Sequence, residues 1–490
     1  MNFPLLYRTI RYLKPKQIVY QIRAKFFHPR FEDISSPTME IEPISVDPIV
    51  KYTSLSGKTF CFLNIYDSFK SWNQTENGML WAYNLNYMDW LGQETICEKE
   101  GCEWIDKYIE ELPNNNVGLD PYPIALRSIN WIKFLSRHPM SRSKKRLDSL
   151  YSQLLLLEKK LEYRLLGNHL LEDSYALYIG AAFFREEAKL KKYQTLLYSQ
   201  LQEQILPDGA HFEQSPMYHC ILLDRLLDCI NIRKTNELVA YAERMLGHLE
   251  SMCWEGQNIP LLNDSAKGIA PEPRQLFDYA KRLGLSWVPI KMKECGYRKL
   301  IAGGIDAIID VGNITASYQP GHTHADCLNY VLHINGNPVV VDTGVSTYNP
   351  TERRQYERST PAHNCVSVGG KDSSEVWGGF RVGKRCEVQI INDGDSCVVA
   401  SHNGYDKPCI REFQINQQEF IIIDRYKGNA VSYIHLAPGV LSDVVQIEHA
   451  EKVDVCEDII SEEYNLFMDT KCLKIYFNDY CKYKIIANKI

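Results

Sequence analysis

The sequence predicts two domains, an all-α domain at residues 1–295 followed by an antiparallel β-sandwich at residues 296–490. Three observations predict this division. The chain has 490 residues, which is too long for one ordinary domain. Up to about residue 290, apolar residues recur at helical spacing. After Gly296 the chain consists of short runs rich in Val, Ile and Tyr, separated by turn residues. We place the border near residues 290–302.

The first part of the chain predicts helical hairpins. In residues 121–135, Ala125, Ile129 and Ile132 fall on one face, and the run from Leu223 to Ile230 follows the same helical spacing. Further helices are expected at residues 144–165, 169–184, 187–204, 236–253 and 274–283. Breaks are expected at Pro113, Pro121, Pro207-Asp208-Gly209 and Pro260.

The second part predicts strands joined by tight turns. Asn335-Gly336 lies between two apolar runs, which is a hairpin signal. A two-residue turn there would place Ile334 opposite Asn337 and Asp342 beside about Asn329. Several short strands at this spacing favour a β-sandwich.

Composition excludes several classes of protein. Hydrophobic residues make up 45% and charged residues 24%, which excludes a disordered or fibrous chain. The net charge of −6 argues against a nucleic-acid binder, so an anionic substrate must be met by a local cluster of cations. No apolar run approaches the ~18 residues of a membrane span. Fifteen scattered cysteines without a CxxC pair predict a reduced chain.

The N-terminal residues 1–27 lack the apolar core of a signal peptide, because Arg and Lys interrupt them every few residues. We therefore expect a cytoplasmic protein, with a periplasmic or membrane-surface location as the alternative. The basic and apolar residues of this segment could form a helix lying on a membrane. A helix packed on its own domain is the simpler expectation.

Polar residues interrupt apolar sequence in four places: GNHLLED (167–173), DGAHFEQSPMYH (208–219), GHTHAD (321–326), and DTG (342–344) with AHN (362–364). Each alone has a structural explanation, such as a helix cap at Ser215-Pro216. His322 and His324 would lie on the same side of an extended segment, as a metal or acid–base site requires. Two His and one Asp can ligate zinc with one position open. The hairpin register requires residues 322–328 to fold back for such a site to form.

These four motifs, in this order, resemble the heparinase II/III-like polysaccharide lyases and the related alginate lyases. The resemblance implies an N-terminal incomplete (α/α) toroid, a C-terminal antiparallel β-sandwich and an active cleft between them. The resemblance implies four catalytic residues, which are Asn168, His169, Tyr218 and His322. It also implies that a structural zinc ion is bound by His324, Asp342 and His363. Glu172 resembles an acidic helper, and Tyr348 a second site tyrosine for which Tyr356 competes.

The family reaction is β-elimination, which removes the C5 proton of a uronic acid and expels the 4-O substituent. The sequence leaves open whether His322 or Tyr218 is the base. Arginine suits carboxylates and sulfates, so Arg127 on the helical side and Arg354 on the sandwich side, with Arg353 and Arg358, are candidates for binding substrate.

The function we expect is a lyase acting on a uronic-acid-containing polysaccharide: glycosaminoglycan-like, of the heparan sulfate type, or a bacterial surface polymer. The partner is then an anionic polysaccharide and not a nucleic acid, with the oligomeric state open. Alternatives are a C5-epimerase-like enzyme, a non-catalytic carbohydrate-binding protein of surface-polysaccharide assembly, and a zinc hydrolase.

Overall fold

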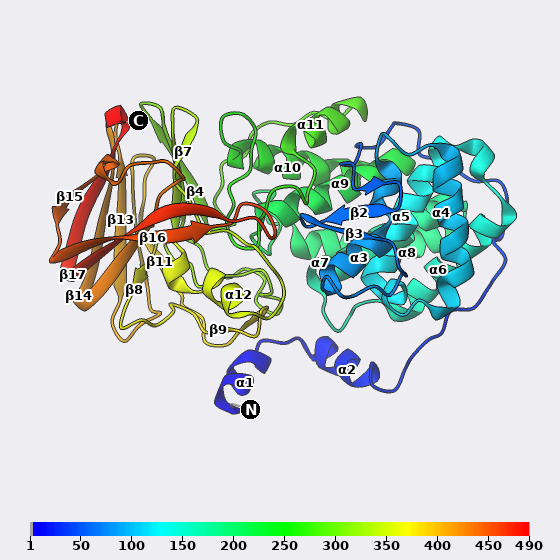
Figure 1. Cartoon of the computed structure of the whole chain (residues 1–490), viewed down its shortest axis with the longest axis horizontal. Helices are drawn as coiled ribbons and strands as arrows, with labels where there is room; N and C mark the ends of the chain where they lie inside the picture. The colour runs from blue at the N-terminus through cyan, green and yellow to red at the C-terminus, as the bar shows by residue number, and fades with distance from the viewer. Residues whose placement is uncertain (1–2, 490) are drawn as a thin grey trace.

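The computed structural model describes residues 3–489 and shows two lobes, one helical and one built of strands (Figure 1). The change from helix to strand lies between the end of helix α11 at Arg282 and the start of strand β4 at Tyr297. Some core side chains of the first strands, including Tyr297 and Ile308, belong to the same hydrophobic cluster as the helices. The two lobes therefore share a packed boundary.

Several helices of the helical lobe pack against the next helix along the chain. Two of its N-caps can be read from the sequence: the Ser143 and Ser215 side chains accept backbone hydrogen bonds from Arg146 and Tyr218. The helices are α3 (Met79–Tyr87), α4 (Glu98–Glu111), α5 (Pro121–Arg137), α6 (Lys144–Lys160), α7 (Gly167–Phe183), α8 (Glu187–Gln204), α9 (Pro216–Ile232), α10 (Asn236–Met252) and α11 (Pro273–Arg282).

Helix α7 is the central helix of this lobe. It contacts α5, α6, α8 and α9. All of its residues except His169 are buried, although Asn168, Glu172 and Asp173 are polar. A helix that is buried all round must satisfy its polar side chains inside the protein. The polar residues of α7 therefore point to internal networks rather than to a solvated face.

The N-terminal part is not all-α, so that prediction is wrong in one region. A three-stranded antiparallel sheet precedes α3, formed by β1 (Leu55–Ser56), β2 (Thr59–Phe62) and β3 (Ile65–Ser68). Phe60 and Phe62 of β2 pack edge-on against Trp90, Trp104 and Trp81. Two short helices, α1 (Phe3–Ile10) and α2 (Pro15–Arg23), lie along the lower edge in Figure 1.

The second lobe is a sandwich of antiparallel sheets. One sheet has four strands in sequence order, β4 (Tyr297–Ala302), β5 (Ile305–Asp310), β6 (Tyr330–Ile334) and β7 (Asn337–Val340). The other has the order β11-β12-β13-β14-β17-β15, with β8 also on β14 and β16 also on β17. Its strands are β8 (Val366–Ser367), β11 (Val388–Asp393), β12 (Cys397–His402), β13 (Cys409–Ile415), β14 (Glu419–His435), β15 (Val445–His449), β16 (Lys452–Ile460) and β17 (Met468–Ile486).

Side chains from both sheets form one core, as Leu332 of β6 and Phe413 of β13 illustrate. The Asn335-Gly336 turn joins β6 to β7, and Ile334 pairs with Asn337 as the hairpin signal predicts. A helix, α12 (Glu352–Glu357), and a small hairpin of β9 (Val376–Trp377) and β10 (Arg381–Val382) lie between β7 and β11.

The prediction of a fully reduced chain is wrong at one pair, because Cys327 and Cys386 form a disulfide. The other described cysteines are free thiols. Among residues 3–489, no helix has both the length and the apolar character needed to cross a bilayer.

Candidate active site

A buried carboxylate joins the two lobes. Asp264, in the loop between α10 and α11, accepts hydrogen bonds from Arg354 at both oxygens (Nη1 to Oδ1, 2.6 Å; Nη2 to Oδ2, 2.8 Å). It also accepts from His322 Nδ1 (3.0 Å) and His324 Nε2 (2.9 Å). Burial acts to raise the pKa of Asp264, but Arg354 and the two imidazoles hold it well below its usual value. Asp264 is therefore an anion around which three sandwich residues are arranged.

His322 and His324 do lie on the same side of their segment, since each bonds to one oxygen of Asp264. The carboxylate fixes Nδ1–H of His322 and leaves Nε2 facing Asn168 Nδ2 (3.3 Å) and Glu213 Oε2 (3.3 Å). A carboxylate on Nδ1 sets the tautomer of an imidazole and supports its other nitrogen as a proton acceptor.

Asn168 does not cap its helix but faces the histidine. Its backbone N–H and its Nδ2 donate to the two oxygens of Glu213, each at 2.8 Å. The approach requires glycine at position 167, because φ is +57° there and a Cβ would lie 2.4 Å from Glu213 Oε1. Leu166 also has a positive φ of 63°. Such backbone conformations cost energy and persist where the surroundings enforce them.

Tyr218, in the first turn of α9, stacks on His322 with ring centroids 3.8 Å apart. Burial and the carboxylates of Asp264 and Glu213 raise the pKa of Tyr218, and Tyr348 and Arg354 only partly oppose this. The phenol therefore stays protonated near neutral pH.

Tyr218 and Tyr348 line a cavity of about 100 Å³ between the lobes. The aromatic side chains of Tyr87 and Tyr122 form part of the same wall, as do the cations Lys51 and Arg225. Both cations contact Asp224, at 3.1 Å and 2.9 Å. The cavity thus combines aromatic faces with charges that are largely neutralised.

His169 lies beside the cavity residue Tyr122, with ring centroids 4.8 Å apart. Its Nδ1 bonds to Glu162 Oε2 at 2.8 Å. Burial lowers the pKa of His169, but the charge and hydrogen bond of Glu162 outweigh it, so the net shift is upward. His169 is the one partly exposed side chain of α7 and lies behind Tyr122, outside the lining of the cavity itself.

The three predicted zinc ligands are buried near one another. His363 Nδ1 bonds to Asp342 Oδ2 at 2.8 Å, and the His324 and His363 rings lie 5.2 Å apart. His324 Nδ1 and His363 Nε2 are buried without a hydrogen-bond partner. Burial lowers the pKa of His324 to about 3, so this imidazole is neutral, as a metal ligand must be, whereas the charge and hydrogen bond of Asp342 outweigh burial and raise the pKa of His363. In donor chemistry and burial, these residues fit a zinc ion.

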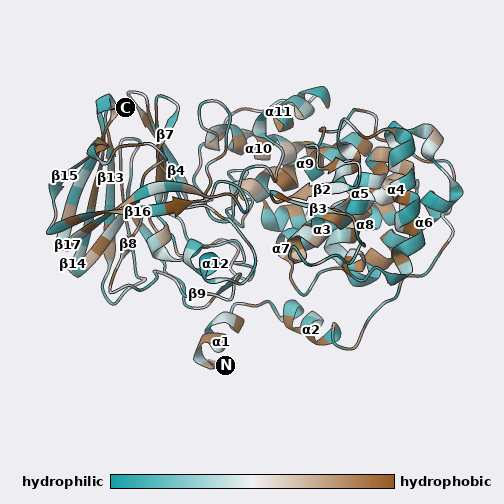
Figure 2. Cartoon of the chain, in the orientation of Figure 1, coloured by the Kyte–Doolittle hydropathy of each residue, from teal (hydrophilic) through white to brown (hydrophobic). Residues whose placement is uncertain are grey.

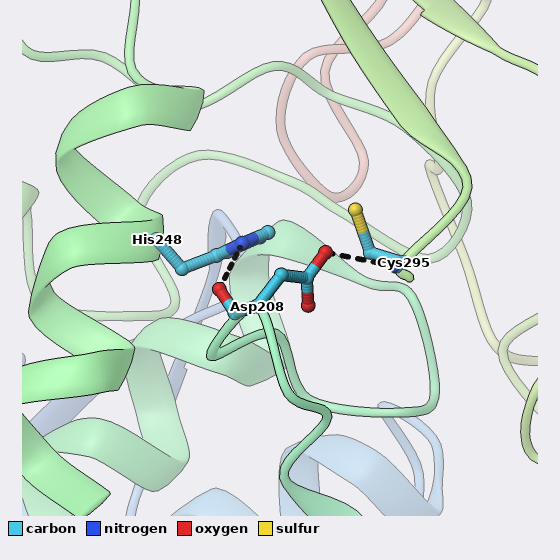
Figure 3. Close-up of side chains that lie close together, drawn as sticks. All are labelled: Asp208, His248 and Cys295. Carbon is cyan, nitrogen blue, oxygen red and sulfur yellow. Dashed lines mark hydrogen bonds between the residues drawn. The ribbon is translucent and has the colours of Figure 1, made fainter. Parts of the chain in front are cut away.

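Within residues 3–489, two side-chain clusters bring three ligand atoms within 4.8 Å of one another, and the predicted triad is not one of them. The first is His435, Asp458 and Cys472, where both His435 nitrogens already bond to Asp458 Oδ2 and the Pro361 carbonyl. The second is Asp208, His248 and Cys295 (Figure 3).

The Asp208 cluster holds the motif 208–219 against the sandwich. Asp208 Oδ2 accepts from the backbone N–H of Lys293 (3.0 Å) and Cys295 (2.9 Å), where the chain enters β4. His248 of α10 bonds through Nδ1 to the Asp208 carbonyl at 3.1 Å (Figure 3). Further along the motif, Gln214 Nε2 donates to the Cys295 carbonyl. These bonds fix the loop that carries Glu213 and Tyr218.

Three of the predicted substrate-binding residues, Arg127, Arg354 and Glu172, have side chains that are completely buried and paired inside the protein, so their contact with substrate stays a prediction. The Arg127 guanidinium donates to Gln153 Oε1, the Asn86 carbonyl and the Gly118 carbonyl. Arg354 is paired with Asp264 and lies under the Tyr348 ring, where it positions the site rather than binding substrate. Glu172 lies 3.8 Å from Arg225 beneath the cavity wall.

Two residues of the site were not among the predicted ones. Glu213 lies inside the motif at residues 208–219, where nothing in the sequence distinguishes it from its neighbours. Asp264 follows Asn263 in a polar stretch after Pro260, where the sequence predicts only a helix break. The available signal is the polar pair Asn263-Asp264 between two helices. The residues that contact Asp264 are distant in the sequence, so the sequence does not identify them.

Two regions of the chain match known protein families. Residues 147–270 match the heparinase II/III N-terminus, and residues 286–467 match the heparinase II/III-like C-terminal domain. The chain belongs to the heparinase II/III-like family. Asn168, Glu213, Tyr218 and Asp264 lie in the first matched region, and His322, His324, Asp342 and His363 in the second. The cluster around Asp264 is thus formed where the two family domains meet.

The chain is similar to a heparin-sulfate lyase of Bacteroides thetaiotaomicron, with 22% identity over 348 residues. The match covers 57% of this chain but only 47% of that relative, about half its length. A crystal structure of heparinase III aligns with a TM-score of 0.65 and 14% identity, covering 99% of this chain and 92% of that one. Heparan sulfate lyase HepC from Pedobacter heparinus aligns with a TM-score of 0.54 and 16% identity, covering 96% and 87%. The predicted fold class is confirmed by these likenesses.

Proposed function

We propose that this protein is a polysaccharide lyase that cleaves a uronic-acid-containing polysaccharide by β-elimination. The observation that carries the proposal is the stacking of Tyr218 from the helical lobe on His322 from the sandwich, beside the Asn168 amide. An acid, a base and a carboxylate-binding donor then meet at one place. The names of the family relatives, which are heparan sulfate lyases, support the same reaction class.

The first requirement of the reaction is to stabilise the uronate carboxylate as it takes up the charge of the C5 carbanion. Asn168 Nδ2 has two N–H donors, of which one bonds to Glu213 and the other points toward His322. The second donor can bind the substrate carboxylate, and His169 supplies positive charge nearby. Removing one such preorganised donor costs about 3–4 kcal/mol of transition-state stabilisation.

The proton transfers follow from the environments of the two rings. Asp264 holds a proton on His322 Nδ1, so Nε2 accepts the C5 proton and Asp264 stabilises the imidazolium that forms. Tyr218 is protonated because its pKa is raised, so it can donate its proton to the departing 4-oxygen. This assigns His322 as the base and Tyr218 as the acid.

The cavity favours carboxylates over a dense array of sulfates. Its lining cations, Lys51 and Arg225, both contact Asp224, which reduces the positive charge offered to substrate. We therefore propose a uronate polymer of low sulfation, either glycosaminoglycan-like or a bacterial surface polymer. The aromatic walls at Tyr87 and Tyr122 suit the apolar faces of sugar rings.

We also propose that His324, Asp342 and His363 hold a structural zinc ion. A bound zinc would supply a rigid link between the strand segments rather than an activated water. Two buried imidazole nitrogens without partners support this. Metal analysis of the purified protein should find one zinc per chain, and His363→Ala should lose it and melt at a lower temperature. If the purified protein contains no metal and a chelator leaves its melting temperature unchanged, the proposed zinc site is refuted.

An activity screen tests the lyase assignment. The wild type is incubated with hyaluronan, chondroitin, heparan sulfate, heparin, alginate and bacterial capsules, and ultraviolet absorbance reports the unsaturated product. Tyr218→Phe and His322→Ala should each reduce cleavage at least about a hundredfold, whereas Tyr66→Phe, at a tyrosine that is 75% exposed, should not. Deuterium uptake at C5 without cleavage would assign an epimerase instead. Tight binding without either reaction would assign a carbohydrate-binding protein.

A further inference from the structure

The N-terminal helices pack against the body of the protein through polar side chains. In α1, Arg8 donates to both oxygens of Glu375, at 2.7 and 2.5 Å, and Thr9 Oγ1 accepts from Trp377 Nε1 at 3.1 Å. No side chain of α1 is buried. This helix is therefore attached to the hairpin of β9 and β10 by polar contacts and by the half-buried Leu5, whose side chain borders Gly383.

Helix α2 is attached in the same way. Its one buried residue is Gln17, whose Nε2 donates to the carbonyls of Leu165 (3.0 Å) and Tyr318 (3.2 Å). Lys14, directly before the helix, forms an ion pair with Glu203. The side of α2 that faces the protein is thus mainly polar, with Tyr20 packed against Tyr163 as its aromatic contact.

The large apolar side chains of the same segment point to solvent. Phe26 is 82% exposed and Phe3 is 75% exposed. The full set with large exposure is Phe3, Tyr7, Ile10, Ile18, Val19, Ile22, Phe26 and Phe27. Figure 2 shows hydrophobic residues on both short helices at the edge of the molecule. A surface helix normally does the opposite and buries its apolar stripe, and an exposed apolar patch of this kind marks an interaction surface.

The charge of the segment is as uneven as its hydropathy. Residues 1–30 contain seven Lys and Arg and no Asp or Glu. Because the whole chain carries −6 and this segment +7, the remainder carries −13. Five of the cations are exposed beside the apolar side chains: Arg11, Lys16, Arg23, Lys25 and Arg30. Exposed aromatic and aliphatic residues bordered by Lys and Arg are the features of helices that lie in the interface of an anionic bilayer.

We infer that residues 3–30 form a docking surface for an anionic lipid membrane, with α1 and α2 lying in the plane of the interface. A second copy of this chain fits the surface less well. Symmetric pairing of the two segments would place their exposed cations against one another, which costs binding energy. An anionic bilayer instead accepts the apolar side chains and attracts the cations at once. The inference concerns binding alone and does not depend on the proposed lyase activity.

Vesicle sedimentation with the full chain tests this. The wild type should bind vesicles of phosphatidylglycerol and phosphatidylcholine, and bind pure phosphatidylcholine vesicles much more weakly. The apolar variant Tyr7→Ser, Ile18→Ser, Ile22→Ser, Phe26→Ser should bind the anionic vesicles at least about tenfold more weakly, since each apolar group adds to the partition energy. The charge variant Arg11→Gln, Lys16→Gln, Lys25→Gln should lose affinity and most of its salt dependence.

A matched control changes equally exposed apolar residues outside the segment. Tyr66→Ser, Val288→Ser, Ile301→Ser and Val455→Ser, at positions between 50% and 75% exposed, should leave vesicle binding unchanged. All substituted side chains in the apolar variant are exposed, so its thermal melting should match the wild type. Wild type that ignores anionic vesicles would overturn the inference. So would a lipid-free dimer in light scattering that the apolar variant converts to a monomer, since that result assigns the surface to a second copy.

Discussion

Replacing Asp264 by Asn tests whether one carboxylate holds the two lobes and the catalytic histidine together. The substitution keeps the volume of the side chain but removes its charge. Arg354 is then left buried without a counter-charge, since both of its terminal nitrogens bond to Asp264. Breaking a buried pair by removing one partner costs about 3–5 kcal/mol. We expect the free energy of unfolding to fall by this amount.

The chain offers a matched control in a second bidentate pair. Arg298 Nε and Nη2 donate to the two oxygens of Asp393 at 2.9 and 3.0 Å, but the Asp393 side chain is 38% exposed. The Arg298 side chain is only 7% exposed, but solvent reaches the Asp393 carboxylate and screens the pair, so Asp393→Asn should cost about 1 kcal/mol, less than Asp264→Asn. The two variants differ in burial and not in the chemistry of the change.

Urea unfolding of both variants, followed by circular dichroism between pH 5 and pH 8, measures the difference. The pKa of Asp264 is held well below its usual value despite burial, so its stabilisation is present above the unfolded-state pKa of about 3.9 and is lost only as the pH falls through the lower folded value. The deficit should therefore be constant over this range. Activity should also fall, because His322 loses the acceptor at Nδ1. If Asp264→Asn unfolds no more easily than Asp393→Asn, the central role of this carboxylate is refuted.

Three further predictions concern buried charges. Burial raises the pKa of Glu172 to about 7, so the wild type should lose stability as the pH rises from about 4 to 7. Glu172→Gln should remove this loss. In urea unfolding at pH 8 the variant should therefore be about 3 kcal/mol more stable relative to the wild type. Because the pKa of His169 is raised, its protonated form stabilises the fold at a pH below the unfolded-state pKa of about 6.5. This stabilisation is lost as the pH rises through the folded-state pKa. Glu162→Gln should lower the His169 pKa measured by NMR. Arg127→Met leaves three hydrogen-bond acceptors unpaired, so it should lower the free energy of unfolding by about 3 kcal/mol or more in melting experiments without changing KM. A raised KM at normal stability would instead support the predicted contact between Arg127 and substrate.

The sequence by itself determined the secondary structure of most of the chain. Helical spacing located α5 to α11, Ser215-Pro216 indicated the start of α9, and Asn335-Gly336 indicated the turn between β6 and β7. These features depend on residues within one or two turns of each other, so the local pattern is sufficient. The order of the four polar motifs also indicated the family. The small sheet before α3 was missed because its strands are two to four residues long.

Only the tertiary structure decided which polar residues serve the site. Nothing in the sequence distinguishes Arg127 from Arg354. In the structure, Arg127 forms its hydrogen bonds inside the helical lobe, whereas Arg354 pairs with Asp264. The partners of Asp264 lie 58 to 90 residues away in the chain, and no local periodicity links them. Burial turns these distant contacts into strong constraints, because an unpaired charge away from water is too costly to leave uncompensated. The site is therefore a property of the boundary between the lobes, which a pattern along the chain does not encode.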